Sequence, residues 1–222
     1  MPLPESMSTL AARLASPVVL SGLLAERPAR GGAQASVLAL IAEEQSGPDL
    51  LFIEKSSLLR KHAGQMAFPG GRAEPHDPDP IHTALREAEE ETAVDPSSVE
   101  VLGALPAAHV SNSGFDVTCV VGWWREPGPV YPADPGEVAA VHRIRVADLI
   151  EPQRRGSVLY NPSAWGPAFN LGELFIWGLT AHLLDALLDL AGWSQPWDNQ
   201  SFVEVPPRFG IGFHPNSRVD EH

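Results

Sequence analysis

The chain has 222 residues and a formal net charge of -13, from 28 Asp and Glu against 15 Lys and Arg. This acidity argues against a nucleic-acid partner, which requires basic side chains to neutralise phosphates, and against binding to anionic membranes. A single cysteine, Cys119, excludes an intrachain disulfide and a multi-cysteine metal site, so a cytoplasmic location is the expectation.

The first third of the chain predicts a short helix followed by a β-hairpin. Residues 8–14 have the pattern of a helix with Ser8 as its N-cap. The apolar runs 36–43 and 50–54 have strand composition, and the polar segment between them is typical of a hairpin connection. We expect a third short strand at 65–68, ending at a Pro-Gly-Gly turn.

An acidic, proline-rich loop at 74–80 then leads into segment 81–92, whose strong helix formers predict a helix. No linker divides the chain, and we expect one α/β (α+β) domain with a mixed sheet. The remaining predicted elements are strands at 99–105, 115–124 and 137–146, a short helix near 147–150, a long loop at 151–169, a helix at 174–190 and a tail at 193–222.

The helix at 81–92 carries the residues that point to chemistry. Glu87, Glu90 and Glu91 stand at i, i+3 and i+4, so they share one face. Like charges at this spacing repel, and a bound cation would relieve the repulsion. Carboxylate oxygens suit hard ions, which predicts Mg²⁺ or Mn²⁺ rather than Zn²⁺. A solvated helix face is the alternative, and the preceding glycine turn and acidic loop favour the metal site.

Segment 71–94 resembles a Nudix box, whose pattern is G-x5-E-x7-R-E-U-x-E-E-x-G-U with U aliphatic. The residues that match the box are Gly71, Arg86, Glu87, Glu90, Glu91 and Val94. Asp77 replaces the first Glu, eight residues rather than seven precede Arg86, and Ala93 replaces the second Gly. We expect Ala93 to end the helix without a left-handed backbone conformation.

Segment 51–71 is similar to the signature of coenzyme A-cleaving Nudix hydrolases, with Lys55 in place of its first Arg and Met66 in place of Val. The resemblance assigns substrate binding to Lys55, Arg60, Phe68, Gly70 and Gly71. Lys55 and Arg60 are basic groups suited to the phosphates of a CoA-like ligand, and surface charge is the alternative.

The resemblance extends over about 36–190 and implies a Nudix fold, with a mixed sheet between helices and the box as loop–helix–loop. It predicts an N-terminal extension with a short helix (1–35), a Nudix hydrolase domain (36–192) and a C-terminal tail that is packed or disordered (193–222). Cys119 replaces a Pro of the family's strand, and we expect it to be a packed strand residue without a catalytic role.

The implied reaction is metal-dependent cleavage of the pyrophosphate of coenzyme A or acyl-CoA to 3′,5′-ADP and (acyl-)phosphopantetheine. Glu87, Glu90 and Glu91 would hold Mg²⁺ or Mn²⁺, and Arg86 would orient them. One of these carboxylates, or Glu137, would activate water.

Two other functions stay open. One is hydrolysis of another nucleoside diphosphate derivative, such as ADP-ribose or NADH, and the other is a non-catalytic, Nudix-like ligand-binding or regulatory module. The expected partner is a small-molecule substrate, with no nucleic acid and no membrane. The oligomeric state is open, with a homodimer as one candidate.

Overall fold

A mixed sheet of eight strands forms the centre of the part of the chain that the computed structural model describes, residues 3–44, 46–161 and 164–209. The path through the sheet is β3-β2-β1-β7-β5, with β4 beside β1, β6 beside β7 and β8 beside β2. Strands β1 and β7 run parallel, and the other pairs are antiparallel. The strands are β1 (Ala33–Glu44), β2 (Gly47–Lys55), β3 (Met66–Ala67), β4 (Gly70–Arg72), β5 (Val99–Ala104), β6 (Ala108–Val110), β7 (Phe115–Trp124) and β8 (Val138–Arg145).

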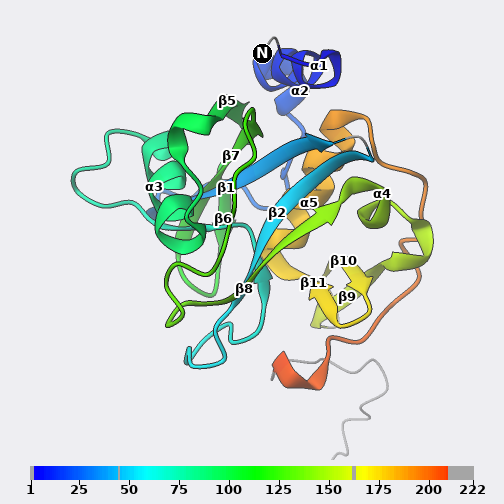
Figure 1. Ribbon diagram of the computed structural model, residues 1–222. Helices are drawn as coiled ribbons and strands as arrows, with labels where there is room; N and C mark the ends of the chain where they lie inside the picture. The colour runs from blue at the N-terminus through cyan, green and yellow to red at the C-terminus, as the bar shows by residue number, and fades with distance from the viewer. Residues whose placement is uncertain (1–2, 45, 162–163, 210–222) are drawn as a thin grey trace, which may run out of the picture.

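Helices cover both faces of this sheet: α3 (Pro80–Thr92) lies on one face and α5 (Gly178–Ala191) on the other (Figure 1). Alternation along β1 explains the arrangement, because successive side chains of a strand point to opposite faces. Leu38 and Leu40 pack in the cluster that contains Ala84 and Ala88 of α3. Ala39 and Ile41 pack in the cluster below α5.

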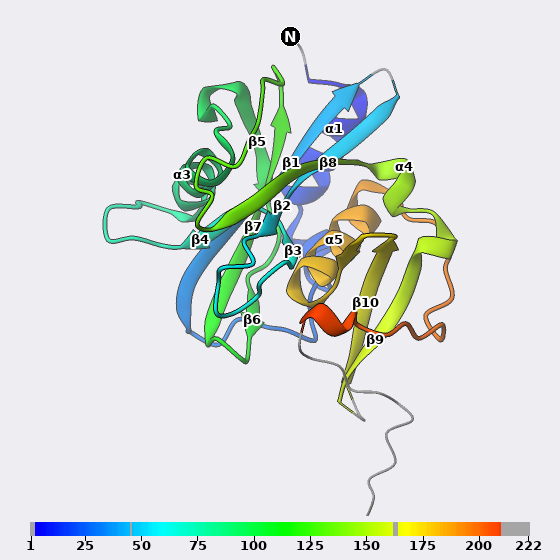
Figure 2. The same cartoon turned by 60° about the horizontal axis from the view of Figure 1, so that its bottom comes forward.

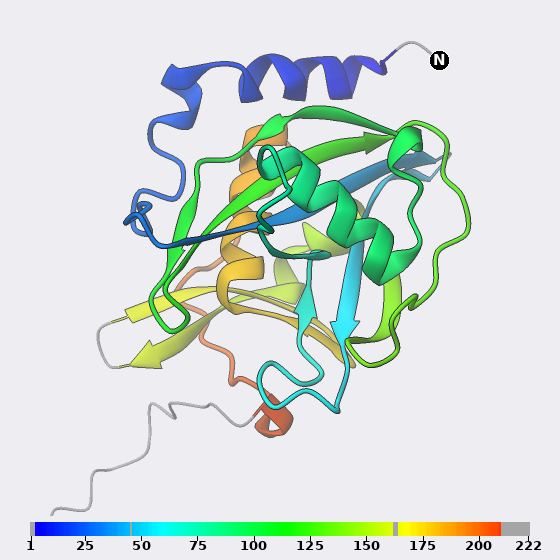
Figure 3. The ribbon, with the colours of Figure 1, turned by 90° about the vertical axis from the view of Figure 1, so that its left-hand side faces the viewer.

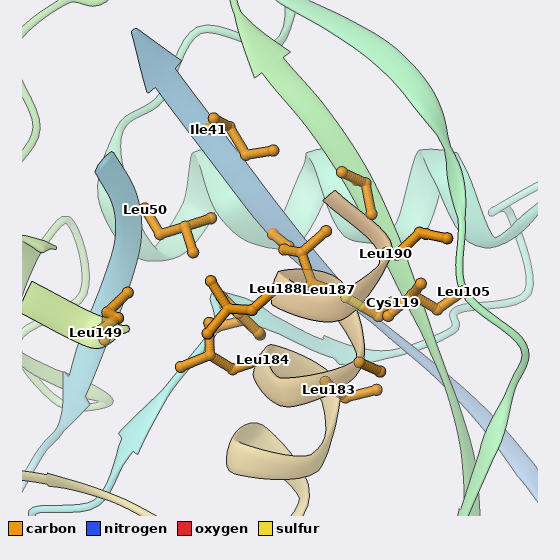
Figure 4. Close-up of a cluster of buried hydrophobic side chains, with 14 of the residues drawn as sticks. Ile41, Leu50, Leu105, Cys119, Leu149, Leu183, Leu184, Leu187, Leu188 and Leu190 are labelled. Atoms are coloured by element: carbon orange, nitrogen blue, oxygen red, sulfur yellow. The ribbon is translucent and has the colours of Figure 1, made fainter. Parts of the chain in front are cut away.

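The leucines of α5 build the larger core. Leu184, Leu187 and Leu188 are buried and point toward the sheet, with Leu50 of β2 and Cys119 of β7 in the same cluster (Figure 4). The Cys119 side chain is fully buried, and burial raises the pKa of its thiol to about 12. Cys119 is therefore a packed strand residue, as the sequence predicts.

The N-terminal helix begins earlier than predicted. Helix α1 spans Glu5–Leu14, its N-cap is Pro4, and Ser8 lies inside the first turns with its N–H donating to the Pro4 carbonyl. The prediction of Ser8 as N-cap is thus wrong, because the buried Met7 extends the apolar face of the helix toward its start. The other short helices are α2 (Pro17–Leu20), α4 (Val146–Leu149), η1 (Pro96–Ser98), η2 (Pro152–Arg154) and η3 (Pro207–Phe209).

A second sheet replaces most of the predicted loop at 151–169. Its strands are β9 (Arg155–Asn161), β10 (Ala164–Leu171) and β11 (Leu174–Ile176), in the order β11-β10-β9. The prediction was wrong because Gly156, Gly166 and Pro167 dilute the strand pattern. The helix predicted from residue 174 begins only at Gly178, because a short apolar run does not distinguish strand from helix.

The end of α3 corrects another expectation. Ala93 is the C-cap in the left-handed region, with φ 59° and ψ 22°, and its N–H donates to the Glu89 carbonyl at 2.9 Å. The expectation of an ordinary backbone at Ala93 is therefore wrong. The helix closes with the same cap geometry that Gly usually provides, and an L-residue adopts it at a cost of about 1–2 kcal/mol.

The C-terminal tail packs along the second sheet as far as the structure describes it. The Ser157 N–H donates to the Ser201 carbonyl at 2.9 Å, and the Val203 N–H donates to the Ser157 carbonyl at 2.8 Å. Residues 210–222 of the predicted tail lie outside the described residues. No described helix combines the length and the apolar character that a membrane crossing requires.

Candidate functional site

Two glycines of the predicted Pro-Gly-Gly turn, which the structure places in the short strand β4, lie against both the sheet and α3; we keep the name glycine turn for Gly70 and Gly71. Gly70 and Gly71 pair with Val37 and Ser36 of β1. A Cβ added to Gly70, which has φ 154°, would lie 2.3 Å from the Ser36 carbonyl oxygen, and one added to Gly71 would lie 2.5 Å from the Glu87 carboxyl. Gly70 therefore excludes a side chain, whereas a side chain at Gly71 would displace the Glu87 carboxyl. The glycine turn thus lies directly beside the acidic face of α3.

Glu91 is the most enclosed carboxylate of this face, with a side chain only 3% exposed. Its Oε2 accepts a hydrogen bond from the Gly70 N–H at 2.8 Å, and its Oε1 lies 3.5 Å from Lys55 Nζ. Burial raises the pKa of Glu91 to about 7 in spite of these two partners. The charge of Glu91 is thus only partly compensated by the protein.

Glu87 is in a similar position one turn earlier. Its side chain is half-buried beside Gly71, and it forms an ion pair with Arg86 Nη1 at 3.0 Å. Burial raises its pKa, Arg86 opposes that effect, and the negative charges of Glu90 and Glu137 add to it. Glu137, which precedes β8, therefore lies close enough to share the electrostatic field of Glu87.

Arg86 holds the other half of the motif together. Its guanidinium donates to both carboxylate oxygens of Asp77, at 2.9 Å and 3.2 Å, and to the Arg72 carbonyl at 3.2 Å. Asp77 also accepts from the Glu74 N–H and the Thr83 hydroxyl. The Arg86 fork holds the pKa of Asp77 well below its usual range.

Asp77 belongs to the sequence motif, but the sequence alone assigns it no role. The structure makes it the anchor of Arg86 and of the loop before α3. The signal for this role was its alignment with the first acidic position of the box. A carboxylate so well compensated has no remaining demand for a cation.

The three predicted metal ligands do not converge in the structure. Glu90 is 58% exposed and is turned to Arg86 Nη1 at 3.0 Å. Across residues 3–44, 46–161 and 164–209, no three His, Cys, Asp or Glu side chains are grouped so that they could hold a metal ion. Arg86 Nη1 lies 3.0 Å from a carboxylate oxygen of both Glu87 and Glu90.

The chemistry of the donors nevertheless fits a hard divalent cation. Burial raises the pKa of both Glu87 and Glu91, and a nearby positive charge would lower both values. All donors on this face are carboxylate oxygens, the ligands that Mg²⁺ and Mn²⁺ prefer.

The predicted substrate-binding residues fall into two groups. Lys55 is 23% exposed at the end of β2, and Arg60 is exposed in the loop that follows. Phe68, by contrast, is 2% exposed and stacks on Phe52 with ring centroids 4.8 Å apart. The Phe68 side chain therefore supports the glycine turn from the core and has no free face for a ligand.

Other polar groups have structural partners. His109 Nδ1 lies 2.7 Å from Asp116 Oδ1, and Asp116 also accepts from the backbone of Arg30 and Gly32. His182 lies between Glu26 and Arg27, and burial lowers its pKa to about 4.

Fold and site together define a class of protein. Its members have a mixed sheet covered by helices, and a glycine turn at the sheet is followed in the chain by an acidic helix. The NUDIX domain model matches residues 32–165, more than half of the chain. The chain therefore belongs to the Nudix family. Members of this family act on small-molecule nucleotide substrates and generally need divalent metal ions.

Relatives and solved structures agree with this assignment. The chain is 40% identical over 162 residues to proteins named uncharacterized Nudix hydrolase NudL from Klebsiella pneumoniae (strain 342) and Escherichia coli (strain K12), covering 69% of this chain and 80% of each relative. A MutT/nudix family protein from Enterococcus faecalis has a similar fold, with a TM-score of 0.50 at 15% identity over 85% of this chain and 74% of that chain.

Proposed function

We propose that the protein hydrolyses the pyrophosphate linkage of coenzyme A or acyl-CoA, with Mg²⁺ or Mn²⁺ as cofactor. The observation that carries the proposal is the pair of half-compensated carboxylates, Glu87 and Glu91, fixed beside the Gly70-Gly71 turn. Their charge is what a divalent cation would neutralise, and a pyrophosphate supplies the further oxygens that such a cation shares.

Each residue of the site has a defined task in this reaction. Glu87 and Glu91, with Glu90 released from Arg86, would hold the cation, which supplies Lewis-acid stabilisation of charge on the phosphates. Arg86 and Asp77 keep the loop and α3 in register through their two-pronged contact. Glu137 is an exposed carboxylate near Glu87 that can accept a proton from the attacking water.

The bond changes are those of a simple hydrolysis. Water adds to one phosphorus of the pyrophosphate and the bridging P–O bond breaks. One proton of the water passes to a carboxylate, and the bridging oxygen leaves with the other phosphate. With CoA the products are 3′,5′-ADP and phosphopantetheine.

The choice of CoA rests on the resemblance of segment 51–71 and on two basic residues beside the acidic site. Arg60 is exposed and has no ion pair with a described residue, so it is available for a phosphate. Lys55 already lies 3.5 Å from Glu91. This contact favours the second candidate, a nucleoside diphosphate derivative without a 3′-phosphate, because Lys55 is then not needed for that group.

A substrate panel separates these functions. CoA, acetyl-CoA, ADP-ribose and NADH are incubated with the protein and Mg²⁺ or Mn²⁺, and the products are resolved by chromatography. We expect 3′,5′-ADP from the CoA compounds at the highest kcat/KM. A preference for ADP-ribose or NADH would establish the second candidate, and no cleavage with either metal would leave the non-catalytic module.

The matched variants are Glu87→Gln and Glu89→Gln. Glu89 is exposed on the same helix, outside the shared face. Loss of a metal ligand removes several kcal/mol of charge stabilisation, which corresponds to a fall in kcat of roughly 100-fold or more. Glu89→Gln should keep wild-type turnover, and near-wild-type turnover of Glu87→Gln would refute the assignment.

A further inference from the structure

The described part of the C-terminal tail, residues 193–209, forms a strap that crosses the second sheet beside β9 (Figure 2). Its middle is fastened by Arg155, which is fully buried between the rings of Phe169 and Trp197, at 4.5 Å and 4.4 Å from their centroids, and forms an ion pair with Asp185. A cation enclosed in this way holds the strap at a fixed position on the sheet.

The end of the strap is fixed by Phe209. The Phe209 side chain is 7% exposed, and its ring centroid lies 6.4 Å from that of Trp177. The neighbouring Arg208 donates to the Glu173 carbonyl and places its guanidinium 4.8 Å from the Phe209 centroid. The ring is thus held by packing and by its neighbour in the chain.

Phe209 also lies beside the loop that carries Arg60, which we name the 56–64 loop, and faces the open side of Gly64. Its Cε1 lies 3.6 Å from the position that a Cβ on Gly64 would occupy, which is van der Waals distance. Gly64 is the last residue of the loop, and its N–H donates to the Lys55 carbonyl at 2.9 Å. Figure 3 shows η3, which contains Phe209, beside this loop.

Most side chains of the 56–64 loop are exposed to solvent, so few of them pack against the rest of the protein. Ser57, Leu58, Arg60, Lys61 and His62 are exposed. Hydrogen bonds inside the loop are local, such as the Leu59 N–H to the Ser56 carbonyl. The start of the loop is held by the Ser56 N–H, which donates to the Glu137 carbonyl at 2.7 Å. A loop with few buried contacts depends on its ends for order.

We propose that Phe209 is a positioning residue, which fixes the end of the 56–64 loop and thereby its basic side chain Arg60, the proposed phosphate-binding group next to Lys55 of β2. This inference rests on the proposed hydrolysis. The strap makes no described contact with Glu87, Glu90 or Glu91, so its effect falls on substrate binding and not on the chemical step. The C-terminal tail is then part of the working site, because its packing sets the geometry of the basic loop.

The test compares Phe209→Ala with Val205→Ala. Val205 is equally buried, at 7% exposure, and packs in the same cluster, but it has no described contact with the loop. Phe209→Ala should raise KM about fivefold, the cost of ordering one long side chain when substrate binds, with kcat unchanged. Val205→Ala should leave KM at the wild-type value, and Phe209→Leu, which keeps a large apolar side chain beside Gly64, should restore KM toward it.

Amide hydrogen exchange provides a second readout that does not need activity. Exchange in peptides covering 56–64 should be faster in Phe209→Ala and unchanged in Val205→Ala. Equal KM values in the two alanine variants, or equal exchange of the loop, would overturn the positioning role. If the wild-type protein cleaves no compound of the panel, the proposed function fails, and the exchange comparison alone decides whether Phe209 orders the loop.

Discussion

Asp77 and Glu91 flank the same glycine turn, yet their surroundings shift their pKa values in opposite directions. Asp77 receives the two-pronged contact of Arg86 together with two further donors, so its pKa is lowered. Glu91 receives one backbone N–H and a lysine at 3.5 Å, and burial raises its pKa. The protein therefore compensates the negative charge of Asp77, which forms with Arg86 the compensated half of the motif and holds the loop. The charge of Glu91 is compensated only in part, and this under-compensated half can bind a cation.

The difference between Asp77 and Glu91 suggests a way for a strongly acidic protein to bind an anion. The net charge of -13 repels a pyrophosphate as long as no cation is bound to the carboxylates of α3. The carboxylates that we propose as cation ligands are Glu87 and Glu91, and Lys55 lies beside Glu91. A bound divalent ion would reverse the local sign, and we expect the metal-free protein to bind substrate poorly.

The largest stability effect is expected from Glu91→Gln in metal-free protein. Between about pH 4.5 and 7 the folded state holds a proton on Glu91 that the unfolded state releases, so wild-type stability falls as pH rises through this window. Glutamine has no such titration. Above pH 7 the variant should gain up to about 3 kcal/mol relative to wild type, as measured by urea unfolding at several pH values with a chelator present.

The matched control is Glu89→Gln, since Glu89 is exposed on the same helix. It should keep the wild-type dependence of unfolding free energy on pH. If Glu91→Gln also keeps the wild-type pH dependence of the unfolding free energy, the protein fully compensates the charge of Glu91. The contrast between Glu91 and Asp77 would then be wrong.

The next effect concerns the compensated half. Asp77→Asn removes the charge that anchors Arg86, and loss of a group that orients metal ligands lowers kcat/KM by about tenfold. Asp79→Asn serves as the comparison, because Asp79 caps α3 through the His82 N–H and makes no described contact with Arg86. Steady-state kinetics with CoA measures both. Equal kcat/KM for the two variants would show that the Arg86 anchor has no part in activity.

The smallest effect is at the end of the helix. Ala93→Gly places the residue that tolerates a left-handed backbone at φ 59°, and it should raise the free energy of unfolding by about 1 kcal/mol. Thermal and urea denaturation measure the change. Activity should stay at the wild-type level, and a loss of stability would mean that the cap is not strained.

The local parts of the fold were predictable from sequence. Helix α3 and strand β7 fall within a residue of their predicted bounds, because their patterns are long and uninterrupted. The hairpin of β1 and β2 follows from its polar connection. The second sheet was missed, since Gly156 and Gly166 weaken the strand pattern. Their neighbours in the tail and at His182 lie so close that a side chain at either position would collide with them.

The site shows the same division. Spacing on α3 placed Glu87, Glu90 and Glu91 on one face, and the helix confirms that arrangement. The Arg86–Glu90 ion pair is an i,i+4 contact that the helix allows, but spacing alone does not show which carboxylate Arg86 contacts. Spacing also could not show that Phe68 stacks in the core, because its partner Phe52 lies on another strand. The role of Phe209 depends on the tail crossing the second sheet, which no local pattern indicates.

Titration of Mn²⁺ into wild-type protein, Glu91→Gln and Glu89→Gln tests the central claim most directly, because it needs no substrate. We expect the wild type and Glu89→Gln to bind Mn²⁺ with the same affinity, and Glu91→Gln to bind at least about tenfold more weakly. Equal affinity of all three proteins, or no binding by the wild type, would contradict a cation site at the under-compensated end of the helix.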